Sequence, residues 1–168
     1  MTTKKKTRQN SALLLRRARD AAANAYAPYS GFAVGAAVET SDGQIFTGAN
    51  MENASYGLTL CAEAGALQAA STAGMLASVR RIAIVGGAID SRPRHPTPVA
   101  PCGRCRQLIQ EASMAARKDI EVITSDLDLR KKQTKSLKNL LPASFSAKDL
   151  PALANWSKRS KRLKMRLK

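Results

Sequence analysis

The sequence predicts an α/β protein, a three-layer α/β/α sandwich around one central mixed sheet. Three observations support this fold class. The chain has 168 residues, 44% of them hydrophobic, which is enough for one domain with a buried core. Helix-like and strand-like segments alternate along most of it. Near the start, two strand-like segments follow each other across a short turn, which adds an antiparallel hairpin to the sheet.

The first half of the chain predicts a helix, a hairpin and a second helix. Ser11 is expected to cap a helix that runs to about Tyr26. Its apolar face would be formed by Leu13, Leu14, Ala18, Ala21 and Ala22. Residues 32–39 and 44–49 are strand-like, and Ser41-Asp42-Gly43 makes the turn between them. Residues 61–73 are rich in alanine and predict a helix that Gly74 ends.

The second half predicts two further strands and a helix. Residues 81–86 (RIAIVG) have the composition of a buried strand, and residues 120–124 predict another. The segment DSRPRHPTP holds three prolines and is therefore expected to be irregular. Residues 102–114 predict a helix, and KNLLPASF predicts a short helix or turn. We find no internal repeat.

The positive charge is concentrated at the two ends of the chain. Of the net charge of +16, residues 1–9 carry +4 and residues 152–168 carry +7 with no acidic residue. We therefore predict a basic, disordered N-terminal tail (1–9), one globular domain (10–151) and a basic C-terminal tail (152–168). Such ends are either solvated segments or a surface that binds a polyanion such as nucleic acid.

The sequence favours a cytoplasmic protein without a membrane span. No hydrophobic run approaches the ~20 residues that a transmembrane helix needs, and the apolar stretch 12–15 is too short for a signal peptide. The three cysteines form an odd set, which is unusual for a secreted disulfide scaffold. In a reducing compartment, such a set is typical of metal binding or catalysis.

The cysteines stand at two expected helix starts. LCAE holds Cys61 and Glu63, and PCGRC holds Cys102 and Cys105. Free backbone amides at a helix N-terminus stabilise thiolates, so the three sulfurs could converge on one Zn²⁺. The fourth position would stay open for water, as in catalytic zinc sites, and Glu63 could move the proton of that water.

Simpler interpretations of the cysteines stay open. A Cys-x-x-Cys pair alone is also found in redox pairs and zinc ribbons, or arises by chance. A structural zinc site would need a fourth protein ligand. The chain has one histidine, His95, and its place in the proline-rich loop predicts an ordinary surface residue. Cys-x-Glu followed by Pro-Cys-x-x-Cys is more specific, because it matches the signature of zinc nucleobase deaminases with a three-cysteine site.

Residues 27–150 resemble the cytidine deaminases of the small, homotetrameric, three-cysteine type. Four motifs carry the resemblance: YSGFAVGAA, NMENASYGLTLCAE, PCGRCRQ and LLPASF. The resemblance implies a three-layer α/β/α fold and the zinc-dependent hydrolytic deamination of cytidine and deoxycytidine. It also implies a homotetramer whose active sites are completed by neighbouring subunits.

The resemblance also implies residue roles. Cys61, Cys102 and Cys105 match the zinc ligands, and Glu63 matches the proton shuttle. Six further residues match positions that contact the substrate. Asn50 and Glu52 match the pair that binds the sugar hydroxyl, Phe32 matches the aromatic residue that packs on the pyrimidine, and Ala62 matches a residue whose backbone contacts the base. Tyr56 and Phe145 match residues that reach into the active site of a neighbouring subunit. Without the resemblance, Phe32 and Phe145 could also be plain core positions.

Two features depart from the family pattern. The proline-rich loop is longer than expected, and Ala64 stands where the family often has an arginine that offsets the charge of the thiolates. Arg104, between two predicted ligands, is our hypothesis for a substitute, and the alternative is that it points to solvent. Three other functions stay open: a deaminase of a cytosine-nucleoside antibiotic such as blasticidin S, a polynucleotide cytosine deaminase recruited by the basic ends, and a non-enzymatic nucleic-acid binder.

Overall fold

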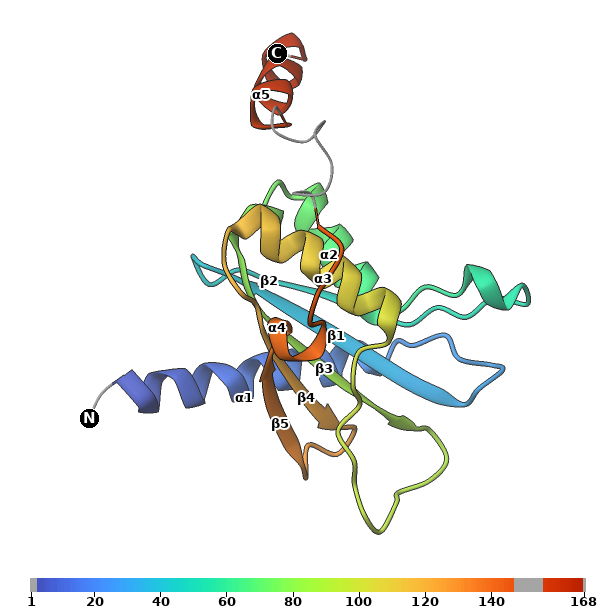
Figure 1. Cartoon of the computed structure of the whole chain (residues 1–168). Helices are drawn as coiled ribbons and strands as arrows, with labels where there is room; N and C mark the ends of the chain where they lie inside the picture. Colours follow the sequence, from blue (N-terminus) through green and yellow to red (C-terminus); the bar gives the residue numbers. More distant parts are fainter. Residues whose placement is uncertain (1–2, 147–155, 168) are drawn as a thin grey trace.

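A five-stranded mixed sheet forms the middle layer of the protein (Figure 1). The computed structural model describes residues 3–146 and 156–167. The strands are β1 (Phe32–Thr40), β2 (Ile45–Ala49), β3 (Val79–Ala88), β4 (Glu121–Asp126) and β5 (Lys132–Ser136), in the order β2-β1-β3-β4-β5. The pair β3 and β4 is parallel and the other pairs are antiparallel. The predicted hairpin and mixed sheet are confirmed.

Helices cover both faces of this sheet (Figure 1). Helix α1 (Thr3–Ala22) lies on one face, and α2 (Ala62–Thr72) and α3 (Gly103–Ala116) lie side by side on the other. Shorter elements are η1 (Tyr56–Leu58), η2 (Leu76–Ser78) and α4 (Leu137–Leu140), and α5 (Trp156–Arg166) is the last helix. The α/β fold class is therefore confirmed. Among the described residues, no helix is both long enough and apolar enough to cross a membrane.

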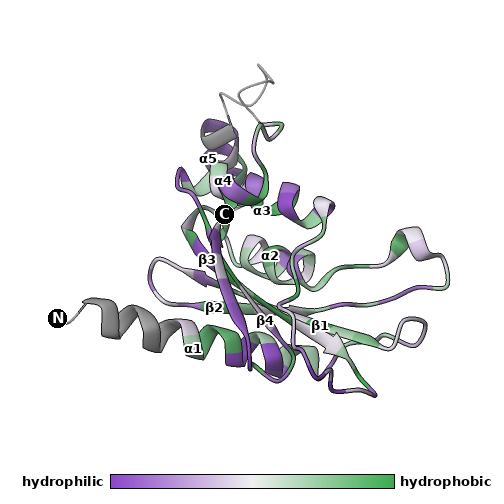
Figure 2. Ribbon diagram, turned by 60° about the horizontal axis from the view of Figure 1, so that its bottom comes forward, coloured by the Kyte–Doolittle hydropathy of each residue, from purple (hydrophilic) through white to green (hydrophobic). Residues whose placement is uncertain are grey.

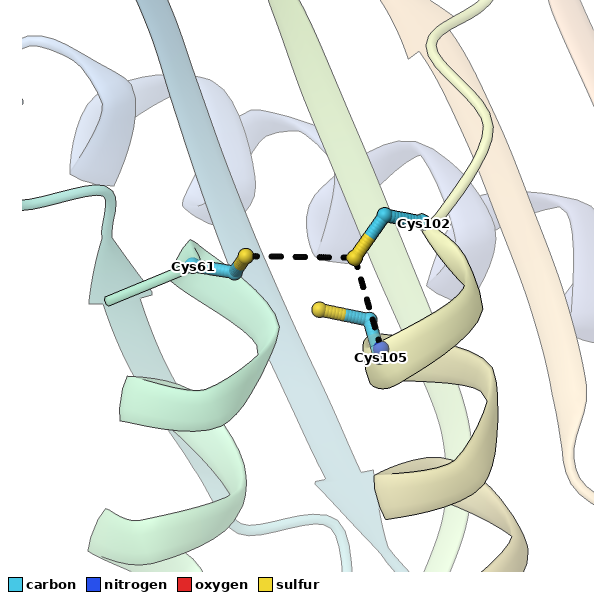
Figure 3. Close-up of side chains that lie close together, drawn as sticks. All are labelled: Cys61, Cys102 and Cys105. Atoms are coloured by element: carbon cyan, nitrogen blue, oxygen red, sulfur yellow. Dashed lines mark hydrogen bonds between the residues drawn. The ribbon is translucent and has the colours of Figure 1, made fainter. Parts of the chain in front are cut away.

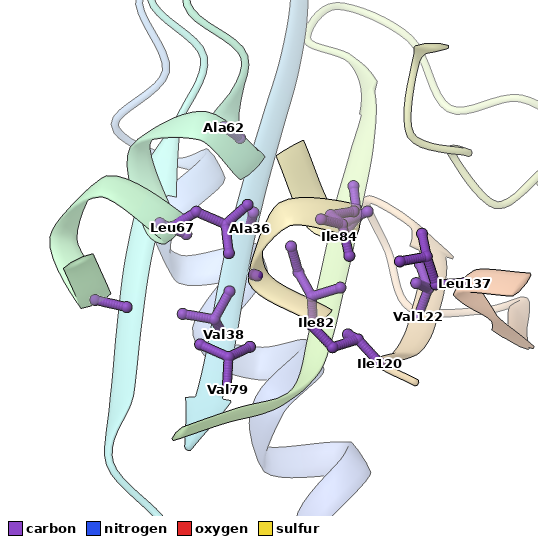
Figure 4. Packing of buried hydrophobic residues seen from close by; sticks show 14 residues of the cluster. Ala36, Val38, Ala62, Leu67, Val79, Ile82, Ile84, Ile120, Val122 and Leu137 are labelled. Atoms are coloured by element: carbon purple, nitrogen blue, oxygen red, sulfur yellow. The ribbon is translucent and has the colours of Figure 1, made fainter. Parts of the chain in front are cut away.

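The alternation of side chains along β3 explains why both faces are covered. Ile82 and Ile84 are fully buried in the cluster beneath α2 and α3 (Figure 4). Ala83 and Val85 belong to the second cluster, which packs against α1. Successive side chains of a strand point to opposite faces, so an uninterrupted apolar strand needs a covering layer on each side. Hydrophobic colouring accordingly concentrates where the central strands meet the helices (Figure 2).

The predicted start of the first helix is wrong. Helix α1 begins at Thr3, so Ser11 lies inside it and does not cap it. The Ser11 hydroxyl instead accepts a hydrogen bond of 3.2 Å from Nη1 of Arg81, whose guanidinium also forms a buried ion pair with Glu39. A tertiary contact therefore satisfies the polar side chain that looked like a local cap. Residues 3–9, assigned above to a disordered tail, have helical backbone, and the division into tails and domain stays a prediction.

Two smaller differences have physical reasons. Leu13 is 46% exposed, and Leu15 is buried in the α1 cluster, so the apolar face is rotated from the predicted one. Strand β5 was not predicted, because its sequence KQTKS has no apolar alternation and its residues are mostly exposed. It is an edge strand that pairs only with β4, so backbone hydrogen bonds rather than burial define it.

Two glycines let the helices lie close to the sheet. A side-chain carbon at Gly35 would collide with the backbone of Ala18 and Ala22 in α1. At Gly48 in β2, such a carbon would lie 2.5 Å from the carbonyl oxygen of Ala62 and 2.5 Å from the amide nitrogen of Ala66. The first turn of α2 therefore rests directly on the backbone of β2. Glycine within a strand is typical of such a close approach.

We expect Gly48→Ala to destabilise the fold, because the added methyl must push α2 away from β2. Overpacking of this kind costs about 1–3 kcal/mol in the free energy of unfolding. Chemical denaturation of the variant and of the wild type measures this difference. Thr47→Ala, at an exposed position of the same strand, is the control and should change stability by a few tenths of a kcal/mol. Equal effects of the two substitutions would contradict the proposed close contact.

Candidate metal centre

Two helix N-termini bring the three cysteines together. Cys61 is the N-cap residue of α2, and Cys102 is the N-cap residue of α3. Cys105 lies in the first turn of α3, where its backbone N–H donates a hydrogen bond of 3.4 Å to Sγ of Cys102. A backbone amide at the start of α3 thus points toward the sulfur of Cys102, and the positive end of each helix dipole favours negative charge near the cysteines.

The three sulfurs are arranged as ligands of one metal ion. They lie within 4.8 Å of one another, and Sγ of Cys61 is 4.0 Å from Sγ of Cys102 (Figure 3). A tetrahedral zinc ion with Zn–S bonds of about 2.3 Å would separate two sulfurs by about 3.8 Å. The observed spacing therefore fits zinc without rearrangement of the backbone. Three protein ligands leave one position of the tetrahedron open, which is the arrangement of catalytic rather than structural zinc.

The pKa values of the three thiols show what it costs to place three thiolates together without a cation. Burial raises the pKa of Cys61, and the neighbouring Cys102 raises it further. Burial and the charge of Glu63 raise the pKa of Cys105. Partial burial alone would raise the pKa of Cys102, but the backbone N–H of Cys105 donates to its sulfur and lowers it. Three adjacent thiolates repel one another, and a divalent cation that replaces their protons removes this repulsion.

Glu63 is a buried carboxyl group next to the three cysteines. It stands in the first turn of α2, two residues after Cys61, and is only 4% exposed. Burial raises the pKa of its carboxyl group, an effect opposed in part by hydrogen bonds from its own backbone and from the side chain of Cys105. A buried carboxyl group beside a metal site, with its pKa moved toward neutrality, is suited to accept and return protons.

Asn50 and Glu52 hold the start of β1. Oδ1 of Asn50 accepts a hydrogen bond of 2.8 Å from the N–H of Val34, and its Nδ2 donates one of 3.0 Å to the carbonyl oxygen of Phe32. Oε2 of Glu52 accepts from the backbone N–H groups of Tyr29 and Ser30, at 2.9 and 3.2 Å. Hydrogen bonds from the Ser30 side chain and these amides lower the pKa of Glu52, so its carboxylate stays charged.

The remaining sequence-predicted residues fall into two groups. Ala62 is fully buried at the start of α2, beside the cysteine cluster. The aromatic residues Phe32, Tyr56 and Phe145 are 37%, 73% and 61% exposed, so none of them is a core residue of the single chain. Tyr56 contacts Tyr29 edge to face, with ring centroids 5.7 Å apart. The predicted contacts of these residues with a substrate stay predictions.

Arg104 connects the two helix starts that carry the cysteines by a hydrogen bond to a backbone carbonyl group. Its Nη1 donates a hydrogen bond of 3.2 Å to the carbonyl oxygen of Thr59, two residues before Cys61. The side chain therefore ties α3, which carries two of the sulfurs, to the segment that carries the third. Offset of the thiolate charge by Arg104 stays a prediction, since the bond that the structure shows is to a carbonyl oxygen.

Arg106 and Gln107, the last residues of PCGRCRQ, have structural roles that the sequence does not predict. Nε of Arg106 donates to the carbonyl oxygen of Pro101 at 2.9 Å, and its Nη1 donates to that of Leu140 at 3.0 Å. Nε2 of Gln107 donates to the carbonyl oxygen of Phe145 at 3.0 Å. These bonds fix the C-terminal LLPASF segment on the helix that holds two cysteines. No spacing rule in the sequence predicts such partners, because they are carbonyl groups.

The proline-rich loop forms one wall of a cavity. The cavity has a volume of about 550 Å³, and its lining includes Phe32, His95 and Val99. Arg130 holds the loop by donating a hydrogen bond of 2.9 Å to the carbonyl oxygen of Pro93. His95 is exposed, as predicted, and is not part of the cysteine cluster.

Fold and site together define a class of protein: a zinc-dependent hydrolytic enzyme with a three-thiolate site and a buried carboxyl group, built on a three-layer α/β/α sandwich. Residues 8–118 match the family described as the cytidine and deoxycytidylate deaminase zinc-binding region. This match covers more than half of the chain. The chain therefore belongs to the cytidine and deoxycytidylate deaminase family.

Named relatives agree with this assignment. The chain is 41% identical over 140 residues to the cytidine deaminase of Halalkalibacterium halodurans, which covers 82% of this chain and 96% of the relative. It is 41% identical over 134 residues to the cytidine deaminase of Mycobacterium tuberculosis, with coverage of 80% and 88%. The crystal structure of the Burkholderia pseudomallei cytidine deaminase superposes with a TM-score of 0.69 at 41% identity, covering 80% of this chain and 98% of that one.

We expect Cys102→Ser to lose zinc, because two sulfurs do not hold the ion as three do. Elemental analysis of the purified variant should give well under one zinc per chain, against about one for the wild type. His95→Ala is the matched control, since it removes the one histidine of the chain. Full zinc content in Cys102→Ser, or loss of zinc in His95→Ala, would contradict the three-cysteine assignment.

Proposed function

We propose that this protein is a cytidine deaminase that hydrolyses cytidine and deoxycytidine to uridine and deoxyuridine. One water is consumed and one ammonia is released for each base. The observation that carries the proposal is the convergence of three cysteine sulfurs within 4.8 Å beside the buried Glu63. The family assignment supports the same reaction. It does not favour the alternative substrates, blasticidin S or a polynucleotide.

Cys61, Cys102 and Cys105 would hold the zinc ion. When bound, the ion would lower the pKa of a water molecule at its open position toward neutrality. The chain's own part in the chemistry is the handling of protons. Glu63 accepts a proton from the attacking water and delivers it to N3 of the cytosine ring, which makes C4 electrophilic. It then takes the remaining proton of that water, now on the hydroxyl group at C4, and passes it to the amino group, which leaves as ammonia while the C4–O bond becomes a carbonyl.

The same carboxyl group serves both transfers because of where it is held. At 4% exposure, Glu63 exchanges its proton with the reactants more readily than with bulk water. Its position in the first turn of α2 fixes its distance to the ligand Cys61, so the proton donor and the metal move as one unit.

Nucleoside recognition is assigned to the start of β1 and the segment after β2. Phe32 packs on the pyrimidine ring, and the backbone of Ala62 contacts the edge of the base. Asn50 and Glu52 bind a sugar hydroxyl. The hydrogen bonds of Asn50 and Glu52 to the backbone of residues 29–34 support this role, because they hold Phe32 and both polar groups in one rigid unit. One N–H of the Asn50 amide and Oε1 of Glu52 remain for the sugar.

The active form is a homotetramer in which Tyr56 and Phe145 reach into a neighbouring active site. An arm between β2 and α2, residues 51–60, supports this assembly. Its large apolar side chains are exposed in the single chain, by 48% at Met51, 73% at Tyr56, 64% at Leu58 and 43% at Leu60. Clustered apolar exposure of this kind is typical of an interface.

The proposal includes the organisation of the chain. Residues 10–151 form the catalytic domain, and the basic ends 1–9 and 152–168 lie outside it. The cytoplasm is the proposed location, in line with the three reduced thiols.

We expect Glu63→Gln to retain zinc and fold but to lose at least 10²–10⁴-fold in turnover of cytidine. The amide has almost the shape of the carboxyl group and cannot accept a proton. Ultraviolet absorbance follows the conversion of cytidine to uridine, and zinc content and thermal unfolding report on integrity. Glu111→Gln, at an exposed position of α3, is the control and should be fully active. Near-normal turnover by Glu63→Gln would mean that another group moves the protons.

We expect free nucleosides to be substrates and cytidine monophosphates to be rejected, because the Glu52 carboxylate beside the sugar repels a phosphate. Glu52→Gln should raise KM for cytidine and reduce the discrimination against the monophosphate. Steady-state kinetics with both substrates, and with Glu111→Gln as the same control, measure the effect. Efficient turnover of the monophosphate by the wild type would refute this role of Glu52.

A further inference from the structure

The C-terminal helix α5 carries a dense set of exposed cations that catalysis does not use. Six basic side chains, all exposed, lie between its third residue and its end: Lys158, Arg159, Lys161, Arg162, Lys164 and Arg166. Residues 152–168 contain no acidic residue. Between residues that the structure describes, the ion pairs involve Arg19, Arg81, Arg92 and Arg130, and none involves α5.

We propose that α5 is a nucleic-acid-binding element that contacts the phosphate backbone without reading the sequence. Its charge is complementary to a polyanion, and such contacts gain free energy by releasing counterions from the phosphates. This function is separate from deamination, because it tethers the enzyme to a polymer that need not be its substrate.

The distribution of the cations around α5 favours nucleic acid over a lipid surface. At about 100° per residue, the six basic positions spread over about 220° of the helix circumference. A flat bilayer contacts one side of a helix, whereas strands or groove walls of a nucleic acid can contact both sides. The positions of Trp156, Leu163 and Leu167 fall within about 40° of one another on one side of the helix, which is narrower than the apolar stripe of about 100° that is typical of an amphipathic helix. Met165, 75% exposed, lies on the opposite side among the cations. The helix therefore lacks the single broad apolar face of a membrane-surface helix.

The test measures binding of the full-length protein to a fluorescent oligothymidylate of about 20 nucleotides. The probe contains no cytosine, so it cannot be deaminated, and the outcome is independent of the proposed enzyme function. The α5 variant replaces Lys158, Lys161, Arg162 and Lys164 with Gln, which has a similar helix propensity. The matched control replaces four exposed lysines of the domain with Gln: Lys118, Lys132, Lys135 and Lys138.

We expect the wild type and the control to bind, and the α5 variant to bind at least about tenfold more weakly at low salt. For single strands, the slope of log K against log salt is about −0.7 for each phosphate contact, so the α5 variant should lose 2–3 from the slope and the control less than about 1. Cytidine turnover should be equal in all three proteins. Equal losses of affinity in the α5 variant and the control would mean that net charge alone causes the binding, and would overturn the proposal. Absence of binding by the wild type would overturn it too.

A third variant, Leu163→Gln with Leu167→Gln, separates nucleic acid from lipid. We expect it to bind the oligothymidylate like the wild type. Vesicles of phosphatidylcholine with phosphatidylserine provide the second arm. If the wild type binds these vesicles more tightly than the oligonucleotide, and the leucine variant binds neither, the partner of α5 is an anionic bilayer and the proposal is wrong.

Discussion

The meeting of two helix N-termini over one end of the sheet is the constraint on which the site depends. Cys61 and Cys102 cap α2 and α3, and Cys105 follows within one turn, so three sulfurs converge only if both helices begin at the same place. The sheet sets that place. Helix α3 follows β3 and leads back to β4, which pairs with β3 in parallel. Helix α2 rests on β2 through the close contact at Gly48. A shift of either helix by one turn, about 5.4 Å, would separate the ligands.

The backbone bonds around the site serve the same geometry. Arg104 joins α3 to Thr59, two residues before the α2 cap, and Arg106 and Gln107 join α3 to the carbonyl groups of Leu140 and Phe145. Asn50 and Glu52 fix the start of β1. Helix α3 is thereby connected to the segments that carry Cys61 and Phe145, and Asn50 holds the segment that carries Phe32. A site held at so many points is preorganised, which lowers the cost of aligning water, base and carboxyl group.

Much of this arrangement could be predicted from the sequence. Residue type and spacing identify the candidate site residues, Cys61, Glu63, Cys102 and Cys105. Composition and periodicity predict β1, β3 and α2. The misses share a cause. Ser11 resembled a helix cap, but its partner is Arg81, far away in the sequence; β5 is defined by its pairing with β4 and not by its side chains. The sequence also does not reveal that Arg104 donates a hydrogen bond to the carbonyl oxygen of Thr59. Contacts that depend on tertiary placement leave no local pattern.

We propose that deamination depends on a zinc ion held by the three thiolates. This dependence is tested by stripping the metal from the wild type with a chelator and titrating zinc back while following conversion of cytidine to uridine. We expect the stripped protein to be inactive, and activity to rise linearly with added zinc and to stop rising at about one ion per chain. Full turnover by the stripped protein, or activity that does not depend on the amount of zinc bound, would contradict it.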